Sequence, residues 1–279
     1  MTDPAARTSE PGGRMSDVTI SIENLTKTFR QPTGESLTVL QGISFGVSEG
    51  DFVIVLGESG CGKSTLLSLV AGLTPATDGR IEARGELVTA PHPSRSILFQ
   101  QPSLLPWLNV ADNIVFGCRL RGERKDLELR ANQLIEIMGL AGFEHHYPHE
   151  LSLGMAQRAC LARSLIGHPE ILLLDEPFAS LDTITRTHLQ DELIEFWMVE
   201  KFTAIFVTHD IDEAILLGNR IVLLGGRPCR VLETLEVNLN YPRDITSRSF
   251  FMLRAAILRK LREGFSDHHP HPGERGTTP

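Results

Sequence analysis

The sequence lacks the long apolar runs and the paired cysteines that mark several large classes of protein. No stretch approaches the roughly 18 consecutive apolar residues of a membrane span. The four cysteines, Cys61, Cys118, Cys160 and Cys229, form no CxxC pair and have no metal-ligand spacing. A disulfide framework or a zinc module is therefore not expected, and free thiols in a reducing compartment are.

Positive charge is also scarce, because the formal net charge of the chain is −8. Broad surfaces that bind nucleic acid or anionic membranes need clustered Lys and Arg, so we expect no nucleic-acid partner. Residues 1–13 are polar and rich in Pro and Gly, without the apolar core of a secretory signal. We expect residues 1–16 to be a disordered extension, with Met15 as an alternative start, and the chain to be soluble by itself.

What the sequence does contain is an alternation of short apolar runs with helical stretches. Apolar or alternating runs predict strands at residues 18–22, 37–40, 43–47, 51–56, 96–99, 171–174 and 203–208. Helical patterns predict helices over residues 64–70, 185–200 and 249–262. Strands alternating with helices are typical of α/β folds with a parallel sheet, and the early alternating runs favour a mixed one.

The middle and the end of the chain depart from this alternation. Residues 110–138 read as helical, and the charged run 119–130 predicts a solvated helix-loop-helix face. We expect an inserted helical subdomain at about residues 101–168, a helical extension over 241–264 and a disordered tail over 265–279. The tail contains three histidines that could bind a metal, but prolines flank them and no thiol or carboxylate framework is present, so an unstructured tail is the simpler interpretation.

One short segment fits the phosphate-binding loop pattern of Gly, four residues, and Gly-Lys-Ser/Thr. Its residues are Gly57, Glu58, Ser59, Gly60, Cys61, Gly62, Lys63, Ser64 and Thr65. Glycines let the backbone approach a ligand closely, so that its N–H groups and the following helix N-terminus can bind phosphate. An apolar run precedes the loop and a helical run follows it, which is the required order. The alternative is a glycine-rich turn that binds nothing.

A second motif supplies the acidic residues that such a loop needs. Asp175 and Glu176 follow the apolar run 171–174. Asp175 suits Mg²⁺ together with the Ser64 hydroxyl, Lys63 can reach the β- and γ-phosphates, and Glu176 can polarise the attacking water. A strand that merely ends in solvated acids is the alternative. For Cys61 two interpretations stay open, a redox-sensitive thiol and a small filler residue.

With five further segments in order, these motifs resemble the ATP-binding subunit of ATP-binding cassette (ABC) transporters. The segments are Leu151–Arg158 at the place of the family signature, Ser180-Leu181-Asp182 as the D-loop, His209 as the switch histidine, Gln100 as the Q-loop glutamine and Phe29 as the aromatic that stacks on adenine. The resemblance spans about residues 18–262. It implies an α/β P-loop NTPase fold, an ABC ATPase domain over residues 17–240, and ATP and Mg²⁺ as cofactors.

The resemblance also implies a role for each matching residue. Gln100, Glu176 and His209 would act in hydrolysis, Thr65 would contact the α-phosphate, and Mg²⁺ would be held by Ser64, Gln100 and Asp175. The signature residues Ser152, Leu153, Gly154 and Met155 would close on ATP held by a second copy, which implies a homodimer. Leu153 and Met155 depart from the usual Gly and Gln. Either Leu153 is strained at φ > 0, with weak closure in trans, or Ser152 is the N-cap of a helix running to Ile166; we favour the second.

The resemblance finally implies a partner in the membrane. A chain with one set of motifs and no membrane span would need an integral permease and, in an importer, a periplasmic or lipid-anchored solute-binding protein, at the cytoplasmic face of the inner membrane. The segment 101–110 is where cassettes engage the permease, and Trp107 would either dock there or pack into the helical subdomain.

Three features favour one class of importer within the family. The segment Leu104–Trp107, the pair Gly154-Met155 and the tail from Tyr241 to Asp244 resemble the nitrate/sulfonate/taurine importers. A lipid-transport cassette is an alternative, because such cassettes share the Met. A non-transport cassette would carry long insertions or paired cysteines, which are lacking, and an inactive cassette has only Leu153 in its favour.

Overall fold

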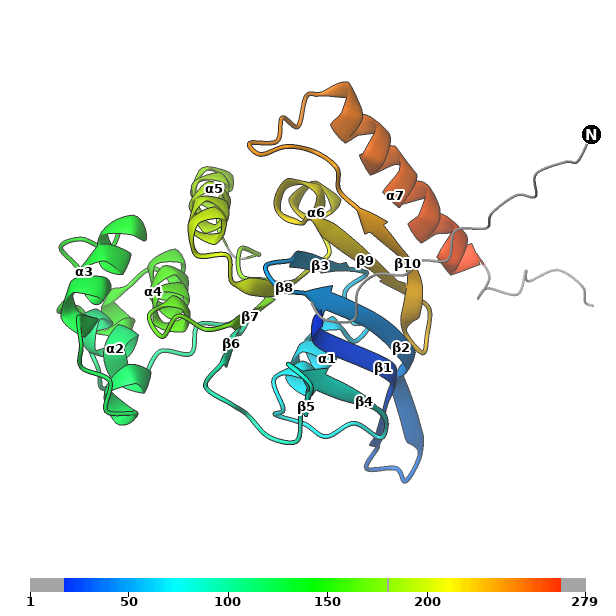
Figure 1. Cartoon of the computed structure of the whole chain (residues 1–279), viewed down its shortest axis with the longest axis horizontal. Coiled ribbons are helices and arrows are strands. Elements are labelled where there is room, and N and C mark those ends of the chain that lie inside the picture. Colours follow the sequence, from blue (N-terminus) through cyan, green and yellow to red (C-terminus); the bar gives the residue numbers. More distant parts are fainter. Residues whose placement is uncertain (1–17, 180, 267–279) are drawn as a thin grey trace, which may run out of the picture.

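The computed structural model describes residues 18–179 and 181–266 as two sheets with helices packed around them (Figure 1). This confirms the predicted α/β class and the mixed sheet. The predicted extension at residues 1–16 and the tail histidines lie outside the described residues.

A six-stranded sheet forms the centre of the molecule, with strand order β10-β9-β3-β8-β7-β6. Its strands are β3 (Phe52–Leu56), β6 (Arg95–Leu98), β7 (Ile171–Asp175), β8 (Thr203–Thr208), β9 (Arg220–Gly225) and β10 (Arg230–Glu236). The pairs from β9 to β6 are parallel, and only β10 is antiparallel. Every residue of β3, β7 and β8 is buried, as continuous apolar runs predict for parallel strands covered on both faces.

A second, antiparallel sheet has the strand order β2-β1-β4-β5. Its strands are β1 (Val18–Arg30), β2 (Ser36–Ser48), β4 (Asp78–Ala83) and β5 (Glu86–Leu87). The prediction of separate strands at 37–40 and 43–47 was wrong, because both segments belong to β2. Register shifts in its pairing with β1, together with Gly42 at positive φ, interrupt the apolar alternation that the prediction relied on.

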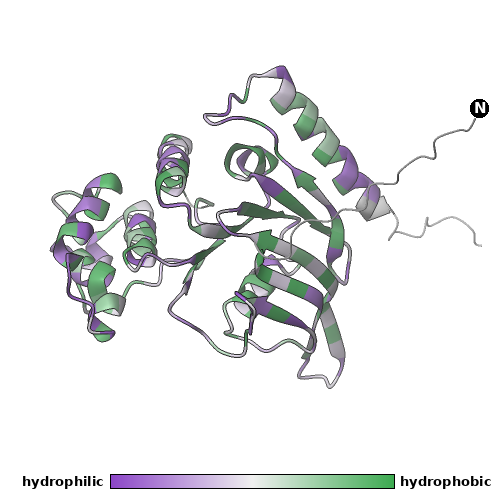
Figure 2. Ribbon diagram, viewed as in Figure 1, coloured by the Kyte–Doolittle hydropathy of each residue, from purple (hydrophilic) through white to green (hydrophobic). Residues whose placement is uncertain are grey.

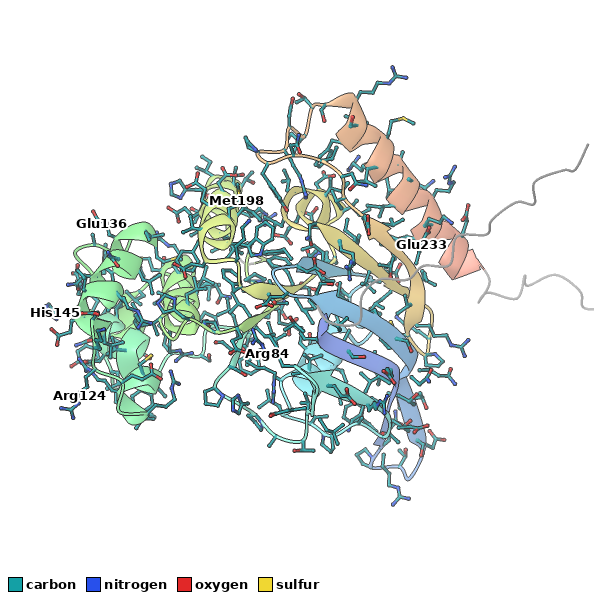
Figure 3. The ribbon with its side chains drawn as sticks, in the orientation of Figure 1. Arg84, Arg124, Glu136, His145, Met198 and Glu233 are labelled. Atoms are coloured by element: carbon teal, nitrogen blue, oxygen red, sulfur yellow. The ribbon has the colours of Figure 1, made fainter. Side chains whose placement is uncertain are left out.

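A group of helices lies at one end of the six-stranded sheet, beyond β6 (Figure 1). It contains α2 (Val110–Leu120), α3 (Leu127–Ile137), the short η1 (Pro148–Glu150) and α4 (Leu153–Leu165). The predicted solvated helix-loop-helix face is confirmed, because residues 119–126 are all exposed. Figure 3 shows Arg124, Glu136 and His145 projecting outward from this group.

The C-terminal segment folds back on the six-stranded sheet. Helix α7 (Arg248–Ser266) lies beside β9, β10 and α6 (Ile211–Leu217), and in Figure 2 apolar and polar bands alternate along it. Before α7, the Arg243 guanidinium donates to the carbonyls of Ile215, Leu216 and Gly218. Arg243 therefore caps the C-terminal end of α6, where cations are favoured.

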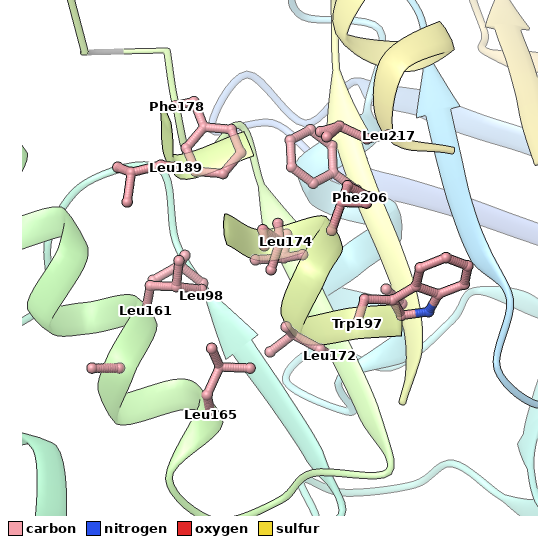
Figure 4. Packing of buried hydrophobic residues seen from close by; sticks show 14 of the residues in the cluster. Leu98, Leu161, Leu165, Leu172, Leu174, Phe178, Leu189, Trp197, Phe206 and Leu217 are labelled. Carbon is pink, nitrogen blue, oxygen red and sulfur yellow. The ribbon is translucent and has the colours of Figure 1, made fainter. Parts of the chain in front are cut away.

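Two hydrophobic clusters pack on opposite faces of the six-stranded sheet. One lies between this sheet and the helices, including α5 (Thr183–Glu200), and Figure 4 shows Phe206 and Leu174 between Trp197 and Phe178 there. Phe52 meets Trp197 edge to face, with ring centroids 5.7 Å apart. The other cluster joins the two sheets and α1 (Lys63–Val70). Both clusters fix the strand ends at which the predicted site residues lie.

Candidate functional site

The predicted site residues converge because three parallel strands end at the same edge of the sheet. Leu56 at the end of β3 pairs with Thr208 at the end of β8, and Asp175 at the end of β7 pairs with Val207. The phosphate-binding loop follows β3, Glu176 follows β7 and His209 follows β8. Ligands commonly bind at the carboxyl ends of strands in such sheets.

The loop from Gly57 to Gly62 has the backbone that its glycines permit. Gly62 has φ of +108° and is the N-cap of α1. A Cβ there would lie 2.7 Å from Val39 Cγ1 and 2.8 Å from Leu40 Cδ2 on β2, so both the conformation and the space require glycine. Gly60 has φ of +79°, and a Cβ built on it would have no atom within 4 Å. The helix N-terminus and the loop amides together form the kind of backbone that binds anions.

Lys63 begins α1 and is buried, with 4% of its side chain exposed. Its ammonium donates to the carbonyls of Gly57 and Glu58, each at 2.9 Å, and lies 3.4 Å from Glu176 Oε1. The positive charge is thereby held inside the curve of the loop. An ammonium so placed can bind the outer phosphates of a nucleotide.

Ser64 and Asp175 meet directly although they are far apart in the sequence. The Ser64 hydroxyl donates to Asp175 Oδ1 at 2.9 Å. Burial raises the pKa of the Asp175 carboxyl, while the hydrogen bond from Ser64 opposes that effect. A buried carboxylate beside a hydroxyl is a pair of oxygen donors that suits Mg²⁺.

Glu176 and His209 form the third contact of the cluster. His209 Nδ1 lies 3.0 Å from Glu176 Oε2, and the Glu176 side chain is 14% exposed. Glu176 also has φ of 45°, a left-handed conformation that is uncommon for residues other than glycine and that occurs often at functional sites. The sequence reasoning missed this conformation, since nothing in the residue type signals it.

The signature-like segment forms the start of α4. Ser152 is its N-cap, and its hydroxyl accepts from the Met155 amide at 3.2 Å, which confirms the predicted cap. Leu153 is not among the residues with positive φ and is 54% exposed, so the alternative of a strained Leu153 is wrong. A Cβ on Gly154 would lie 3.1 Å from Leu181 Cδ2, which places Gly154 against the D-loop segment.

Gln100 follows β6 by two residues and is exposed. With Leu104, Leu151 and Leu153 it lines an open cleft of about 770 Å³ between the signature-like segment and the residues after β6. Sequence reasoning assigned no role to Gln157, whose buried amide donates to the Phe99 carbonyl at 3.2 Å. This bond joins α4 to the residue before Gln100.

The loop after Gln100 is shaped by a fully buried residue that the sequence reasoning also missed. The Asn113 carbonyl accepts from the Leu105 amide, and its NH₂ group donates to the carbonyls of Leu105, Leu108 and Asn109. Trp107 in this loop is 67% exposed. The alternative that Trp107 packs into the helical group is therefore wrong.

Phe29 and Asp182 lie on other elements of the fold, β1 and the start of α5. Phe29 is near the end of β1, is 41% exposed, and has the Lys27 ammonium 4.9 Å from its ring centroid. Asp182 is the N-cap of α5, where the hydrogen bond from the Thr185 amide lowers the pKa of its carboxyl. Phe29 therefore offers an accessible aromatic ring.

Comparison with known proteins identifies relatives of the whole cassette. A family profile described as ABC transporter matches residues 40–179. The chain is 46% identical over 247 residues to the aliphatic sulfonates import ATP-binding protein SsuB of Bacillus thuringiensis, covering 88% of this chain and 97% of that protein. For the protein of the same name in Bacillus subtilis the identity is 44%, with 88% and 94% covered.

Solved structures of cassettes have the same fold. A dimeric structure of a bacterial ABC transporter cassette superposes with a TM-score of 0.71 at 27% identity, covering 79% of this chain and all of that one. A dimer of an ATP-binding cassette in a post-hydrolysis state, bound to ADP and phosphate, gives 0.70 at the same identity and coverage. Across residues 18–179 and 181–266, no helix is both long and apolar enough to span a membrane.

Proposed function

Since the chain belongs to the ABC transporter family of ATP-binding proteins, and so binds and hydrolyses ATP, we propose that it is the ATPase subunit of an importer for aliphatic sulfonates. The substrate class is inferred from relatives that are 44–46% identical over most of the chain and carry that name. The solute itself would be selected by other subunits, so the tests of the ATPase and of the substrate are separate.

The observation that supports the assignment of roles is that three side-chain pairs meet at one sheet edge. They are Lys63 with Glu176, Ser64 with Asp175, and His209 with Glu176. Lys63 would release its carbonyl partners and hold the β- and γ-phosphates of ATP. Glu176 would take a proton from the attacking water, and His209, 3.0 Å from that carboxylate, would orient it and contact the γ-phosphate. Such a base typically contributes about 10²- to 10⁴-fold to the rate.

Mg²⁺ fits the donor atoms that this chain offers. Ser64 Oγ and Asp175 Oδ1 are hard oxygen donors 2.9 Å apart, and Mg²⁺ is usually held by one or two carboxylates together with phosphate oxygens and water. We assign Ser64 and Asp175, together with Gln100, as the residues that would hold the ion. When bound, the ion would neutralise charge on the phosphates.

Two copies of the chain would share each ATP. Ser152 and the amides from Leu153 to Met155 at the start of α4 would face the γ-phosphate of ATP held by the second copy. Phe29 would stack on the adenine of the ATP held by its own chain. The dimeric structures of related cassettes support this arrangement. Because Ser152 already caps the helix, the exposed Leu153 does not distort the backbone that would make this contact.

The membrane partner would dock at the cleft beside Gln100. The exposed Trp107, on the same loop as the cleft residue Leu104 and braced by the buried Asn113, would add an apolar anchor. We infer that an integral permease occupies this cleft, which would hold the chain at the cytoplasmic face of the inner membrane. A periplasmic or lipid-anchored solute-binding protein would deliver the sulfonate to the permease.

The decisive test of the catalytic assignment is Glu176→Gln, with Glu195→Gln as the matched control on the exposed face of α5. We expect the first variant to lose at least about 100-fold in ATP turnover, to keep ATP binding, and to accumulate an ATP-dependent dimer on size-exclusion chromatography. Glu195→Gln should behave as wild type. Equal turnover in the two variants would remove Glu176 from the role of base.

The substrate class needs a separate measurement in the host. Uptake of a radiolabelled alkanesulfonate should stop when this chain is deleted and return when the wild type, but not Glu176→Gln, is supplied. Uptake that persists after deletion would refute the sulfonate assignment and leave the ATPase assignment unaffected.

A further inference from the structure

Cys61 of the phosphate-binding loop lies near Cys229, although the two cysteines are distant in the sequence. Cys229 precedes β10, which lies beside β2 (Figure 1). Its amide donates to the Val39 carbonyl and its carbonyl accepts from the Gln41 amide, both at 2.9 Å, so that it bridges to Leu40 of β2. This is the same part of β2 against which Gly62 packs.

Cys61 points from the loop into the same region. A Cβ built on Gly57 would lie 3.0 Å from Cys61 Sγ and 2.9 Å from the Leu224 carbonyl on β9, so the thiol lies between the loop and the β9–β10 hairpin. Both cysteines belong to one hydrophobic cluster, with exposures of 7% and 1%. Each of the two thiols is the largest influence on the pKa of the other.

The pair combines an activated thiol with a partner thiol. The Cys229 S–H donates to the Cys61 sulfur, and the Lys63 ammonium is close, which lowers the pKa of Cys61 to about 7; the same hydrogen bond and burial raise the pKa of Cys229. Cys61 also precedes the N-terminus of α1, where a thiolate is favoured. By contrast, burial raises the pKa of Cys118 and of Cys160.

We propose that Cys61 and Cys229 form a reversible disulfide that switches off nucleotide binding, with a hydroperoxide as the oxidant. The Cys61 thiolate attacks one peroxide oxygen and the O–O bond breaks, so that Cys61 becomes a sulfenic acid. With hydrogen peroxide the leaving hydroxide takes up the proton that the Cys61 thiol had released, and departs as water. The Cys229 sulfur then attacks that sulfur, the S–O bond breaks, and a second water leaves as the S–S bond forms. Two thiols lose two electrons in total, and a dithiol reductant reverses the change.

The disulfide would disturb the loop because of where Cys61 lies. An S–S bond of about 2.03–2.05 Å requires the sulfurs to move together from hydrogen-bonding distance. On the side that faces β2, Gly62 has no room even for a methyl group, since a Cβ there would lie 2.7 Å from Val39 Cγ1 and 2.8 Å from Leu40 Cδ2. The movement therefore turns the amides that follow Cys61. This consequence rests on the proposed ATP site, whereas formation of the disulfide does not.

The experiment uses the full chain with Cys118→Ser and Cys160→Ser, so that only the pair remains, treated with hydrogen peroxide at pH 7.5. We expect non-reducing peptide mass spectrometry to find the Cys61–Cys229 link, a fluorescent ATP analogue to bind at least tenfold more weakly, and dithiothreitol to restore both. With the further change Cys229→Ser, no link can form, and nucleotide affinity should be retained under the same oxidant exposure. The four-cysteine wild type, analysed in parallel, tests the link if the double variant folds poorly.

Each contrary outcome overturns a defined statement. Oxidation of both thiols without the mutual link would refute the disulfide, and a complete link with unchanged nucleotide affinity would refute the switch. Equal loss of affinity with and without Cys229 would assign inactivation to Cys61 oxidation alone and refute the role of the pair. A reduced wild type that fails to bind ATP would count against the proposed function, and the mass spectrum would still decide whether the disulfide forms.

Discussion

Replacing Gly62 and Gly60 with alanine separates two reasons for glycine in the phosphate-binding loop. Both residues have positive φ, at +108° and +79°, and an L-residue in the left-handed region costs about 1–2 kcal/mol. Only at Gly62 does the new Cβ meet neighbours, at 2.7 and 2.8 Å from side-chain atoms of β2. Overpacking of this kind adds about 1–3 kcal/mol, so Gly62→Ala should cost roughly 2–5 kcal/mol in total.

Two measurements account for that cost. Where the loop keeps its shape, the strain lowers the free energy of unfolding, measured by urea denaturation without nucleotide. Where the loop relaxes away from β2, ATP binding must restore it, and the loss appears in the dissociation constant measured by calorimetry. A tenfold change in affinity corresponds to about 1.4 kcal/mol. If the whole cost of Gly62→Ala appeared in binding, the affinity for ATP would fall roughly 30- to 4,000-fold.

The matched variant decides whether the reasoning holds. Gly60→Ala has open space around the added methyl, so its only cost is that of placing an alanine in the left-handed conformation. If that cost appeared entirely in binding, the affinity for ATP would fall roughly 5- to 30-fold. The sum of the losses in unfolding and in binding should therefore be larger for Gly62→Ala. If Gly60→Ala costs as much or more, the packing of the loop on Val39 and Leu40 is not what requires glycine.

Two further predictions follow from burial and exposure. Asp175→Asn should abolish Mg²⁺-dependent hydrolysis yet stabilise the nucleotide-free chain at pH 7.5, because burial raises the pKa of the Asp175 carboxyl and its ionised form opposes folding as the pH rises through that pKa. Thermal unfolding should show this gain shrinking as the pH is lowered toward the ordinary pKa of an aspartate, about 3.9, and a gain that grows on acidification would contradict the sign. Trp107→Ser should leave the melting temperature and the ATPase rate of the isolated subunit unchanged, because the ring is 67% exposed. It should weaken co-purification with the permease, while the same change at Leu129, 60% exposed on α3, should not; equal effects would argue against docking through Trp107.

Local patterns in the sequence sufficed for the strands β3, β7 and β8 and for the loop motif. The runs at β3, β7 and β8 are apolar throughout because both faces of a parallel strand are covered, and the glycine spacing of the loop is local. Strand β4 was missed because half of it is exposed, so that it carries no apolar alternation. In β2 the irregular pairing with β1 broke the period, which made one strand look like two.

The residue pattern alone predicts that a strand, a phosphate-binding loop and a helix follow one another, and that acids follow a second buried strand. It also determined the cap at Ser152, because capping is a contact between residues three apart in the chain. The folded molecule was needed to show that Glu176 has a left-handed backbone and lies against His209, that Trp107 is exposed, and that Cys61 lies near Cys229. These depend on which strands are neighbours in the sheet, since contacts between distant residues are set by packing of the whole core and leave no local pattern.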